Sequence, residues 1–495
     1  MSRAVVVGSG PNGLAAALTL ASEGLEVTVL EAADRLGGGT RSSELTVPGL
    51  LHDECSAAHP LALDTPFSRR FDLGAHGLRW LWPEVQYSHP LDGGRGAAAW
   101  RSVERTADAL PGRDGRRWKA IFGWLEGRFD RLAAEIVQPV LHVPRAPVAM
   151  GVFGAFSGLP ASLLTRAWAT EEGRALFAGV AAHAFRPFGS PMSSAIGVTL
   201  GTAAHRYGWP VAQGGSQAIS AAMIALATEH GVRFETGVTV RSLEEVADHD
   251  VVMLDTSPRA AADIAGDRMP ARVARAYRRF RHGPGAFKVE FAVDGGVPWA
   301  HAESRLAGTV HVCGDWRETA AAERMTCRGE MPERPYVLVC QQSLADPSRA
   351  NGDLHPLYAY AHVPSGYTGD ATAAIEAQIE RFAPGFRDRI VGRHVRSAVA
   401  MQEHNVNYVG GDIVTGANDP LQMVFRPRAT LDPYATGIDG VYLCSAATPP
   451  GAGAHGMCGY NAALSALARI DPSAARRVRD ASESSIPEPE YAGGW

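Results

Sequence analysis

The chain has 495 residues, of which 46% are hydrophobic and 20% are charged, and its formal net charge is −5. These values are typical of a soluble globular protein with two or three domains, and the weak negative charge gives no electrostatic reason to expect nucleic acid as a partner. The six cysteines are scattered without a C-x-x-C pair, which argues against a disulfide framework, a zinc site or a dithiol redox pair, so no metal is expected.

The sequence also bears on where the protein works. No apolar run approaches the roughly 20 residues that a membrane-spanning helix needs. The first predicted strand begins at residue 3, which leaves no room for a signal peptide. From these two observations we expect a cytoplasmic protein.

A glycine-rich turn directly follows the first predicted strand. Residues 3–7 (RAVVV) form that strand, and Gly8, Gly10 and Gly13 then spell G-x-G-x-x-G at the start of a predicted helix. The next predicted strand ends in Glu31, where an acidic side chain can accept a hydrogen bond from a ribose hydroxyl. This order predicts a dinucleotide-binding βαβ unit, because backbone at the helix N-terminus can approach a pyrophosphate closely.

A glycine cluster at residues 37–39 follows this unit and precedes Arg41. Residues 8–42 resemble the FAD-binding N-terminus of the phytoene dehydrogenase-like flavoproteins, which are relatives of the amine oxidases in the amine oxidase and phytoene desaturase superfamily. The resemblance implies FAD as cofactor and a phosphate contact for Arg41. The cofactor-binding residues that it implies here are Gly8, Gly10, Pro11, Asn12, Gly13, Glu31, Ala32, Gly38, Gly39, Thr40 and Arg41.

The middle of the chain changes from a helical to an extended pattern. Residues 85–205 are mostly helical in pattern, with a strongly amphipathic stretch at 116–137. Residues 284–365 hold three β-rich segments that predict an antiparallel sheet, and 370–386 return to a helical pattern. These two regions are predicted to form a substrate domain.

Residues 213–258, between these regions, are predicted as a helix followed by strands. In the family, such a block returns to the nucleotide domain. The resemblance therefore implies that Val240 and Thr256 lie near the cofactor, and an ordinary extension of the sheet is the alternative.

Together these segments predict an α/β fold, α+β overall. A Rossmann-like FAD-binding domain is built from discontinuous segments, and a substrate domain has an antiparallel sheet and a helical insert. We place the FAD-binding domain at residues 1–84, 206–266 and 396–470, the substrate-binding domain at 85–205 and 267–395, and a C-terminal tail at 471–495, whose last residues have the composition of a disordered segment.

A second glycine turn, formed by Gly451, Gly453 and Gly456, also lies between a predicted strand and a predicted helix. No acidic residue follows at a strand end, so we expect one FAD held by both turns rather than two dinucleotides. The N–H groups of Gly456 and Met457 are the expected donors to the negative charge of reduced flavin. The resemblance of this segment to the family implies two further cofactor-binding residues, Ala446 and Asn461.

Three residues are candidates for catalysis. Lys288 matches a lysine that holds a water against flavin N5 in the amine oxidases; it could also act as a base, and the alternative is a solvent-facing lysine. His455 lies in the second glycine turn, where it either orients substrate or moves a proton, or caps the turn. His59 follows the segment expected along the other edge of the flavin.

The expected activity is FAD-dependent dehydrogenation or desaturation, with hydride passing from a hydrophobic substrate C–H to flavin N5. The expected electron acceptor is oxygen, a quinone or another protein, and the oligomeric state stays open. The alternatives are a flavin amine oxidase, a redox-neutral flavin isomerase, or a prenyl escort protein without catalysis. The five arginines of residues 271–285 form either a solvated helix face or a patch for peripheral contact with anionic lipid.

Overall fold

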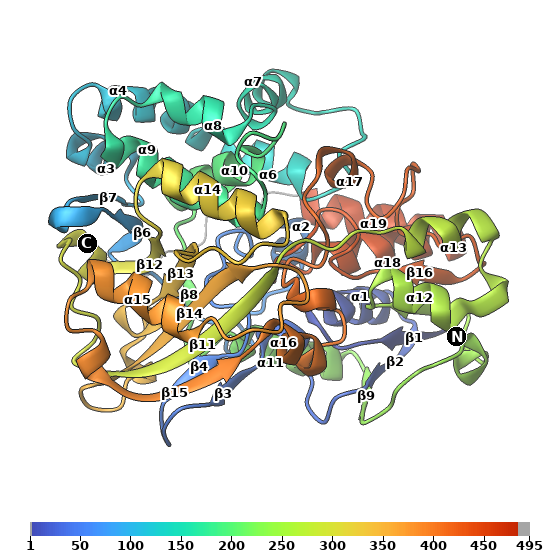
Figure 1. Cartoon of the computed structure of the whole chain (residues 1–495). Coiled ribbons are helices and arrows are strands. Elements are labelled where there is room, and N and C mark those ends of the chain that lie inside the picture. Colours follow the sequence, from blue (N-terminus) through green and yellow to red (C-terminus); the bar gives the residue numbers. More distant parts are fainter. Residues whose placement is uncertain (1, 484–495) are drawn as a thin grey trace.

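The computed structural model describes residues 2–483, and a five-stranded parallel sheet forms the centre of one part of it (Figure 1). Its strands, in spatial order, are β16 (Val441–Leu443), β10 (Val251–Leu254), β1 (Arg3–Val7), β2 (Glu26–Glu31) and β9 (Arg233–Thr236). Side chains alternate between the faces of a strand. Ala4 and Val6 therefore enter one hydrophobic core, while Val5 and Val7 enter another. The predicted Rossmann-like α/β fold is confirmed.

Helices cover both faces of this sheet. One face carries α1 (Pro11–Ser22), α11 (Gln217–Glu229) and α18 (Met457–Ile470). The opposite face carries α12 (Pro258–Ala265) and α13 (Ala271–Arg278). The arginine-rich segment thus begins as α13, which buries Val273, Ala274 and Tyr277 beneath the sheet.

A seven-stranded sheet forms the centre of the other part. Its order is β15 (Ile390–Arg396), β11 (Gly285–Asp294), β14 (Leu354–Val363), β13 (Val337–Cys340), β12 (Ala307–Val312), β6 (Val85–Pro90) and β7 (Gly96–Ala99). The predicted antiparallel sheet is confirmed, with a single parallel pair between β12 and β6. The helical prediction was wrong for residues 85–99, which contain β6 and the edge strand β7. The buried Val85 and Tyr87 of β6 are residue types that favour a strand, whereas β7 is Gly-Ala-Ala-Ala and carries no such signal.

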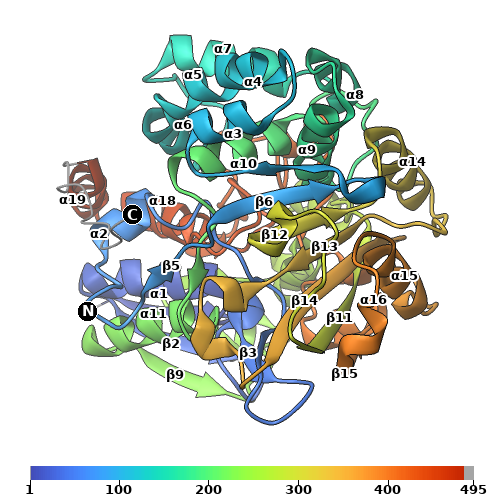
Figure 2. The ribbon, with the colours of Figure 1, turned by 90° about the vertical axis from the view of Figure 1, so that its left-hand side faces the viewer.

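A group of helices covers one side of this second sheet, as Figure 2 shows. The predicted amphipathic helix at 116–137 is broken into α4 (Asp114–Trp118), a π-helical turn (Lys119–Gly123), α5 (Trp124–Glu126) and α6 (Phe129–Ile136). Glycines at 123 and 127, which have low helix propensity, lie at these breaks. The rest of the group is α3 (Val103–Ala109), α7 (Pro147–Ser157), α8 (Ala161–Leu164), α9 (Glu171–Ala181) and α10 (Ala195–Arg206).

The remaining helices connect or flank the sheets. They are α2 (Pro66–Arg70), α14 (Trp316–Cys327), α15 (Thr372–Phe382), α16 (Ala398–His404), α17 (Pro420–Val424) and α19 (Pro472–Glu483). Within the described part of the chain, no single helix is long and apolar enough to cross a membrane. Only α7 taken together with residues 161–167, bent at 92° to each other, meets that test of length and composition.

The C-terminal end differs from the predicted tail at 471–495. Helix α19 packs against α18 and α2, and Ala474, Ala475 and Val478 join the core shared with α1. The short apolar stripe of this helix supplies that contact. The prediction of disorder concerned residues 480–495: residues 480–483 belong to α19, and 484–495 lie outside the described residues.

Candidate active site

A cavity of about 900 Å³ is lined by residues of both sheets and both glycine turns. Residues from opposite ends of the sequence therefore face the same space. The predicted cofactor-binding residues that line it are Gly8, Gly10, Pro11, Asn12, Glu31, Ala32, Gly38, Gly39, Thr40, Arg41, Val240, Thr256 and Ala446. His59 and His455 also line it, whereas Lys288 does not.

The first glycine turn brings backbone close together at the start of α1. Gly8 has φ +104°, a conformation that side chains disfavour. A Cβ at Gly13 would overlap the carbonyl oxygen of Gly8. Glu31 closes the turn, because its carboxylate accepts hydrogen bonds from the Ser9 N–H at 2.9 Å and the Ser9 hydroxyl at 2.6 Å. The acidic residue predicted to meet a ribose thus lies beside the turn and faces the cavity.

Two polar atoms in this part of the cavity have no protein partner. Asn12 Oδ1 and Thr256 Oγ1 are buried and form no hydrogen bond with the described residues. Both residues line the cavity, and both were predicted to contact the cofactor. Buried polar groups are normally satisfied, so these two atoms fit a polar ligand such as the diphosphate and ribose portions of FAD.

The second glycine turn touches the first through a helix contact. A Cβ at Gly459 in α18 would overlap the carbonyl oxygen of Asn12 in α1, so the two helices pack with no side chain between them. Residues 452–455 line the same cavity as residues 8–12. This arrangement favours one cofactor held by both turns, as predicted, because the turns share one binding space.

Four predicted cofactor residues do not line the cavity: Gly13, Gly456, Met457 and Asn461. Gly13 acts through packing, as described above. The Met457 N–H donates to His455 Nδ1 at 3.0 Å, so it is not available as the predicted flavin donor. The Asn461 side chain donates to the carbonyl oxygen of Val137 at 3.1 Å and ties α18 to the end of α6 instead. Gly456, with φ +69°, packs against Ala15 and Phe67.

His455 caps the helix and faces the cavity at the same time. Its Nδ1 accepts from the Met457 N–H, which leaves the ring proton on Nε2. Burial lowers the pKa of His455 to about 4, so the ring is neutral at pH 7. The capping role considered for this residue is therefore present in the structure.

Lys288 is buried behind the cavity wall. It lies on β11, where its Nζ donates to the Asp53 carbonyl oxygen at 2.9 Å, pairs with Glu290 and lies 3.7 Å from the centre of the Tyr358 ring. Burial lowers the pKa of Lys288 to about 7. The predicted contact of Lys288 with a water at flavin N5 stays a prediction, and the alternative of a solvent-facing lysine was wrong. Lys288 is not solvent-facing, and Tyr358 lies on the cavity in its place.

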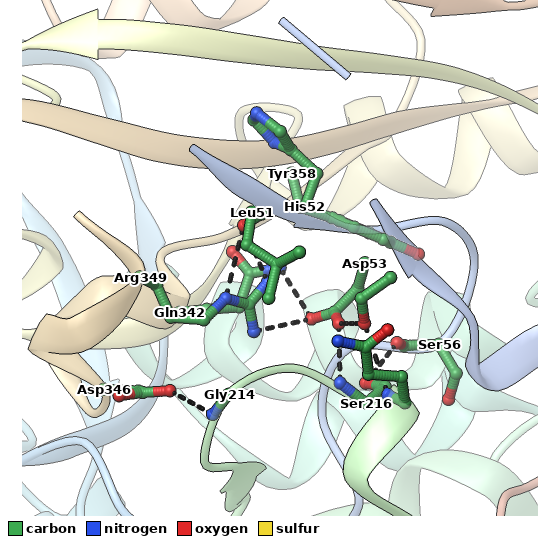
Figure 3. A network of polar contacts seen from close by, with 12 residues as sticks. Leu51, His52, Asp53, Ser56, Gly214, Ser216, Gln342, Asp346, Arg349 and Tyr358 are labelled. Atoms are coloured by element: carbon green, nitrogen blue, oxygen red, sulfur yellow. Dashed lines mark hydrogen bonds and ion pairs between the residues drawn. The ribbon is translucent and has the colours of Figure 1, made fainter. Parts of the chain in front are cut away.

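Asp53 is the centre of a buried polar network behind residues 55–62, which line the cavity (Figure 3). Its Oδ1 accepts from Ser42 Oγ at 2.8 Å and the Ser216 N–H at 2.7 Å, and its Oδ2 accepts from Arg349 Nη1 at 3.1 Å. Burial alone would raise the pKa of Asp53, but Arg349 and these hydrogen bonds outweigh it and lower the pKa. The network fixes the start of the cavity-lining segment. The sequence gives no signal for this pairing, because Asp53 and Arg349 are far apart in the chain.

Asp255 lies directly beneath the first glycine turn and lines the cavity. Its Oδ2 accepts from the Gly13 N–H at 3.0 Å. Burial, with a smaller contribution from the Glu31 carboxylate, raises the pKa of Asp255 from 3.8 to about 7. Its proton therefore leaves near neutral pH, at the place where a cofactor diphosphate would add negative charge.

We expect Asp255→Asn to stabilise the protein at pH 8. The folded chain holds this proton up to about pH 7, whereas the unfolded chain loses it near pH 3.8, so the wild type loses stability as the pH rises between these values. The asparagine side chain cannot ionise and keeps the acceptor for Gly13. Urea unfolding should show a gain of at most roughly 4 kcal/mol at pH 8 that vanishes near pH 4. A gain independent of pH would contradict the assignment.

The sheet end of the cavity holds residues that the sequence did not single out. They are His183, Phe185, Leu200, Trp209, Thr309, Leu338, Cys340, Tyr358 and Tyr360. The period-2 pattern of β14 could have revealed Tyr358 and Tyr360, because Leu357, Ala359 and Ala361 face the opposite core. No Asp, Glu, Lys or Arg lines this end of the cavity within the described part of the chain.

A buried arginine lies behind the second glycine turn. Arg426 is 4% exposed, its Nη2 donates only to the Gly416 carbonyl oxygen at 3.4 Å, and its Nε has no partner among the described residues. A Cβ at Gly451 would overlap Nη1, so the guanidinium lies against the turn. Burial lowers the pKa of Arg426. Asp412 and Asp419 attract this buried charge, but no ion pair joins it to a carboxylate of the described residues, so it favours an anion in the neighbouring part of the cavity.

Comparison with known proteins agrees with this geometry. Residues 6–83 match the NAD(P)-binding Rossmann-like domain family. The chain is 25% identical to rat pyridine nucleotide-disulfide oxidoreductase domain-containing protein 2, and 23% identical to the neurosporene-forming phytoene desaturase of Rhodobacter capsulatus; each alignment covers 93% of this chain and 92% of the relative.

Solved structures share the fold over nearly the whole chain. A putrescine oxidase variant superposes with a TM-score of 0.62 at 16% identity, covering 94% of this chain and 99% of that one. Cyclohexylamine oxidase from Brevibacterium oxydans superposes with a TM-score of 0.56 at 15% identity, covering 97% and 99%. Fold and sequence together define an oxidoreductase of the flavin type. The chain is thus similar in sequence to a phytoene desaturase and in fold to the amine oxidases.

Proposed function

We propose that the protein is an FAD-dependent dehydrogenase that oxidises a C–H bond of an uncharged hydrophobic substrate. The observation that carries the proposal is the single cavity, which reaches from both glycine turns to an aromatic end on the seven-stranded sheet. Its charged lining residues belong to the nucleotide domain and to the segments beside it. They are Glu31, Arg41, Arg241, Asp255, Asp263 and Glu403.

The residues present fit FAD at the nucleotide end. Glu31, the backbone of the first turn, and the unpartnered Asn12 Oδ1 and Thr256 Oγ1 would hold its polar half. When bound, FAD supplies the hydride acceptor. The buried charge of Arg426 behind the second turn would offset negative charge that develops in this region.

His59 is the side chain placed to accept a proton. Ser216 Oγ donates to the Ser56 carbonyl oxygen at 2.6 Å, so its only proton is used and it accepts from His59 Nε2 at 2.9 Å. The remaining nitrogen, Nδ1, therefore carries a lone pair, and it has no hydrogen-bond partner among the described residues. Burial lowers the pKa of His59 to about 4, which keeps the ring neutral at pH 7. His59 can thus accept a proton or a hydrogen bond from a substrate in the cavity.

Amine oxidation is the second candidate. Two features favour it: the aromatic pair Tyr358 and Tyr360 on the cavity, and the fold shared with two amine oxidases. Tyrosine rings can hold an amine without a carboxylate. Against it, no carboxylate at the sheet end of the described cavity would bind a cationic amine.

Anaerobic reduction of the FAD-loaded protein tests the proposal. Uncharged hydrophobic substrates should bleach the flavin absorbance, whereas bleaching by primary amines alone would establish the second candidate. Product formed without an electron acceptor and without bleaching would indicate an isomerase. A protein that takes up no FAD would refute the proposal and favour the escort alternative.

His59→Phe should slow this reduction by roughly 100-fold or more, because a positioned acid or base typically contributes at least that factor. Ser216→Ala is the matched variant. It keeps the imidazole but removes the group that fixes its proton, so a smaller loss is expected. Stopped-flow absorbance gives the rate of flavin reduction in each variant. The FAD content, measured beforehand, shows whether a lower rate reflects slower chemistry or loss of cofactor. An unchanged rate in His59→Phe would exclude His59 as the proton acceptor.

A further inference from the structure

The aromatic end of the cavity contains few polar groups that are free to meet a ligand. Phe185, Trp209, Leu338 and Ile413 contribute apolar surface. The Tyr358 hydroxyl is already used, because it donates to the Cys55 carbonyl oxygen. At this end of the cavity, His183 Nδ1 and the Tyr360 hydroxyl take part in no hydrogen bond between the described residues, and the buried Thr415 Oγ1 has no partner among them either. All three belong to uncharged groups.

His183 is held by a second histidine deeper in the fold. It lies in the turn Ala182–Ala184 at the end of α9, and its Nε2 is 2.9 Å from Nε2 of His311 on β12. The His183 ring also meets the Trp209 ring edge-on, with centroids 5.5 Å apart. One of the two Nε2 atoms must donate and the other must accept. The ring nitrogen that carries the proton on His311 therefore determines which ring nitrogen of His183 carries its proton.

The environment of His311 settles which nitrogen donates. His311 is fully buried, and its Nδ1 has no partner among the described residues. A buried N–H without an acceptor is rarer in proteins than a buried lone pair without a donor. The His311 proton therefore belongs on Nε2, where it is donated to His183. His183 then carries its own proton on Nδ1 and offers it to the cavity.

Neither histidine is charged at neutral pH. Burial lowers the pKa of His183 to about 3 and places that of His311 well below its usual value. With no charged residue at this end of the described cavity, neither an ammonium nor a carboxylate group would find a counter-ion there. This end therefore favours an uncharged ligand, and an oxygen acceptor would satisfy the His183 N–H.

We propose that the substrate is an uncharged lipophilic molecule bearing a carbonyl or comparable oxygen, and that His183 recognises this oxygen by donating a hydrogen bond from Nδ1. This inference rests on the proposed function and adds the substrate class. His311 is a positioning residue, because it fixes the proton of His183 without facing the ligand. No charge is needed for recognition.

Four probes of equal chain length test the proposal: 2-octanone, 1-octene, octylamine and octanoate. Isothermal titration calorimetry on the FAD-loaded protein should rank 2-octanone first, roughly fivefold tighter than 1-octene, since a net hydrogen bond contributes about 1 kcal/mol. Octylamine and octanoate should bind more weakly than either. Tighter binding of octylamine or octanoate than of 2-octanone, or binding of none of the four, would overturn the proposal.

Variants assign the preference to a residue. His183→Leu should reduce the affinity for 2-octanone to that for 1-octene, and His183→Asn, whose amide N–H can replace Nδ1–H, should restore part of the difference. Tyr360→Phe should leave the preference intact; its loss in Tyr360→Phe and retention in His183→Leu would overturn the assignment. Far-ultraviolet circular dichroism and FAD content are measured for each variant. If the protein takes up no FAD, the proposed function fails, but the same titrations on the cofactor-free chain still test the ketone preference.

Discussion

Gly459→Ala is expected to lower the free energy of unfolding by about 3 kcal/mol, with a parallel loss of FAD binding. The added Cβ would overlap the Asn12 carbonyl oxygen and lie 2.9 Å from the Ala16 nitrogen. Both obstacles are backbone atoms of α1, so no rotamer change can relieve them. The helices must separate, and the two glycine turns that line the cavity separate with them.

A matched control uses a helical glycine with free space around it. Gly151 in α7 has no atom within 4 Å of an added Cβ, so Gly151→Ala should stabilise the chain by roughly 0.5–1 kcal/mol through helix propensity. Urea unfolding gives both free energies, and flavin fluorescence gives FAD affinity. Equal stability of the two variants would show that α1 and α18 do not meet at Asn12.

Asp53→Asn is expected to lower the free energy of unfolding by about 3–5 kcal/mol, because it leaves the buried Arg349 without its counter-ion. Arg349 is 1% exposed and Asp53 is fully buried. The new amide NH₂ would also face the Arg349 and Gln342 donors in place of an acceptor. Residues 55–62 lose their anchor, so FAD binding should weaken too.

A surface ion pair supplies the control for this substitution. Arg105 and Glu84 interact at 2.7 Å with side chains about half exposed, so Glu84→Gln should cost at most about 1 kcal/mol. The comparison uses the same chemical change in both variants, carboxylate to amide. An Asp53→Asn protein as stable as Glu84→Gln would mean that the network around Asp53 does not hold the cavity wall.

Local patterns were enough to predict the parts of the fold that depend on neighbouring residues. The βαβ unit was visible because its strand, glycines and acidic strand end follow one another within residues 3–31. The strands at 85–99 were missed because their partners come from a distant segment, β12, and the residues between them and α10 carry a helical pattern. The helix predicted at 116–137 is interrupted near its glycines. The prediction missed this because it relied on the regular spacing of apolar residues and gave the glycines too little weight.

The site was predictable at the cofactor end and largely invisible at the substrate end. A glycine turn binds a cofactor through its backbone, and the spacing of its glycines is enough to predict that backbone geometry. That Lys288 lies behind Tyr358 was not predictable, because strand spacing gives the face of a sheet but not which side chains on that face cover one another; its contact with a water at flavin N5 stays a prediction. His183 became a candidate only through His311, which is remote in sequence, and the state of His59 depends on Ser216 in the same way.

The stoichiometry of nucleotide binding tests the central claim most directly. FAD is titrated into the purified chain and the bound fraction is measured by absorbance after ultrafiltration, with NAD⁺ and NADP⁺ as competitors. One cavity shared by both glycine turns predicts one FAD per chain and no additional nicotinamide nucleotide bound alongside it. Two dinucleotides bound per chain, or a chain that binds none, would contradict it.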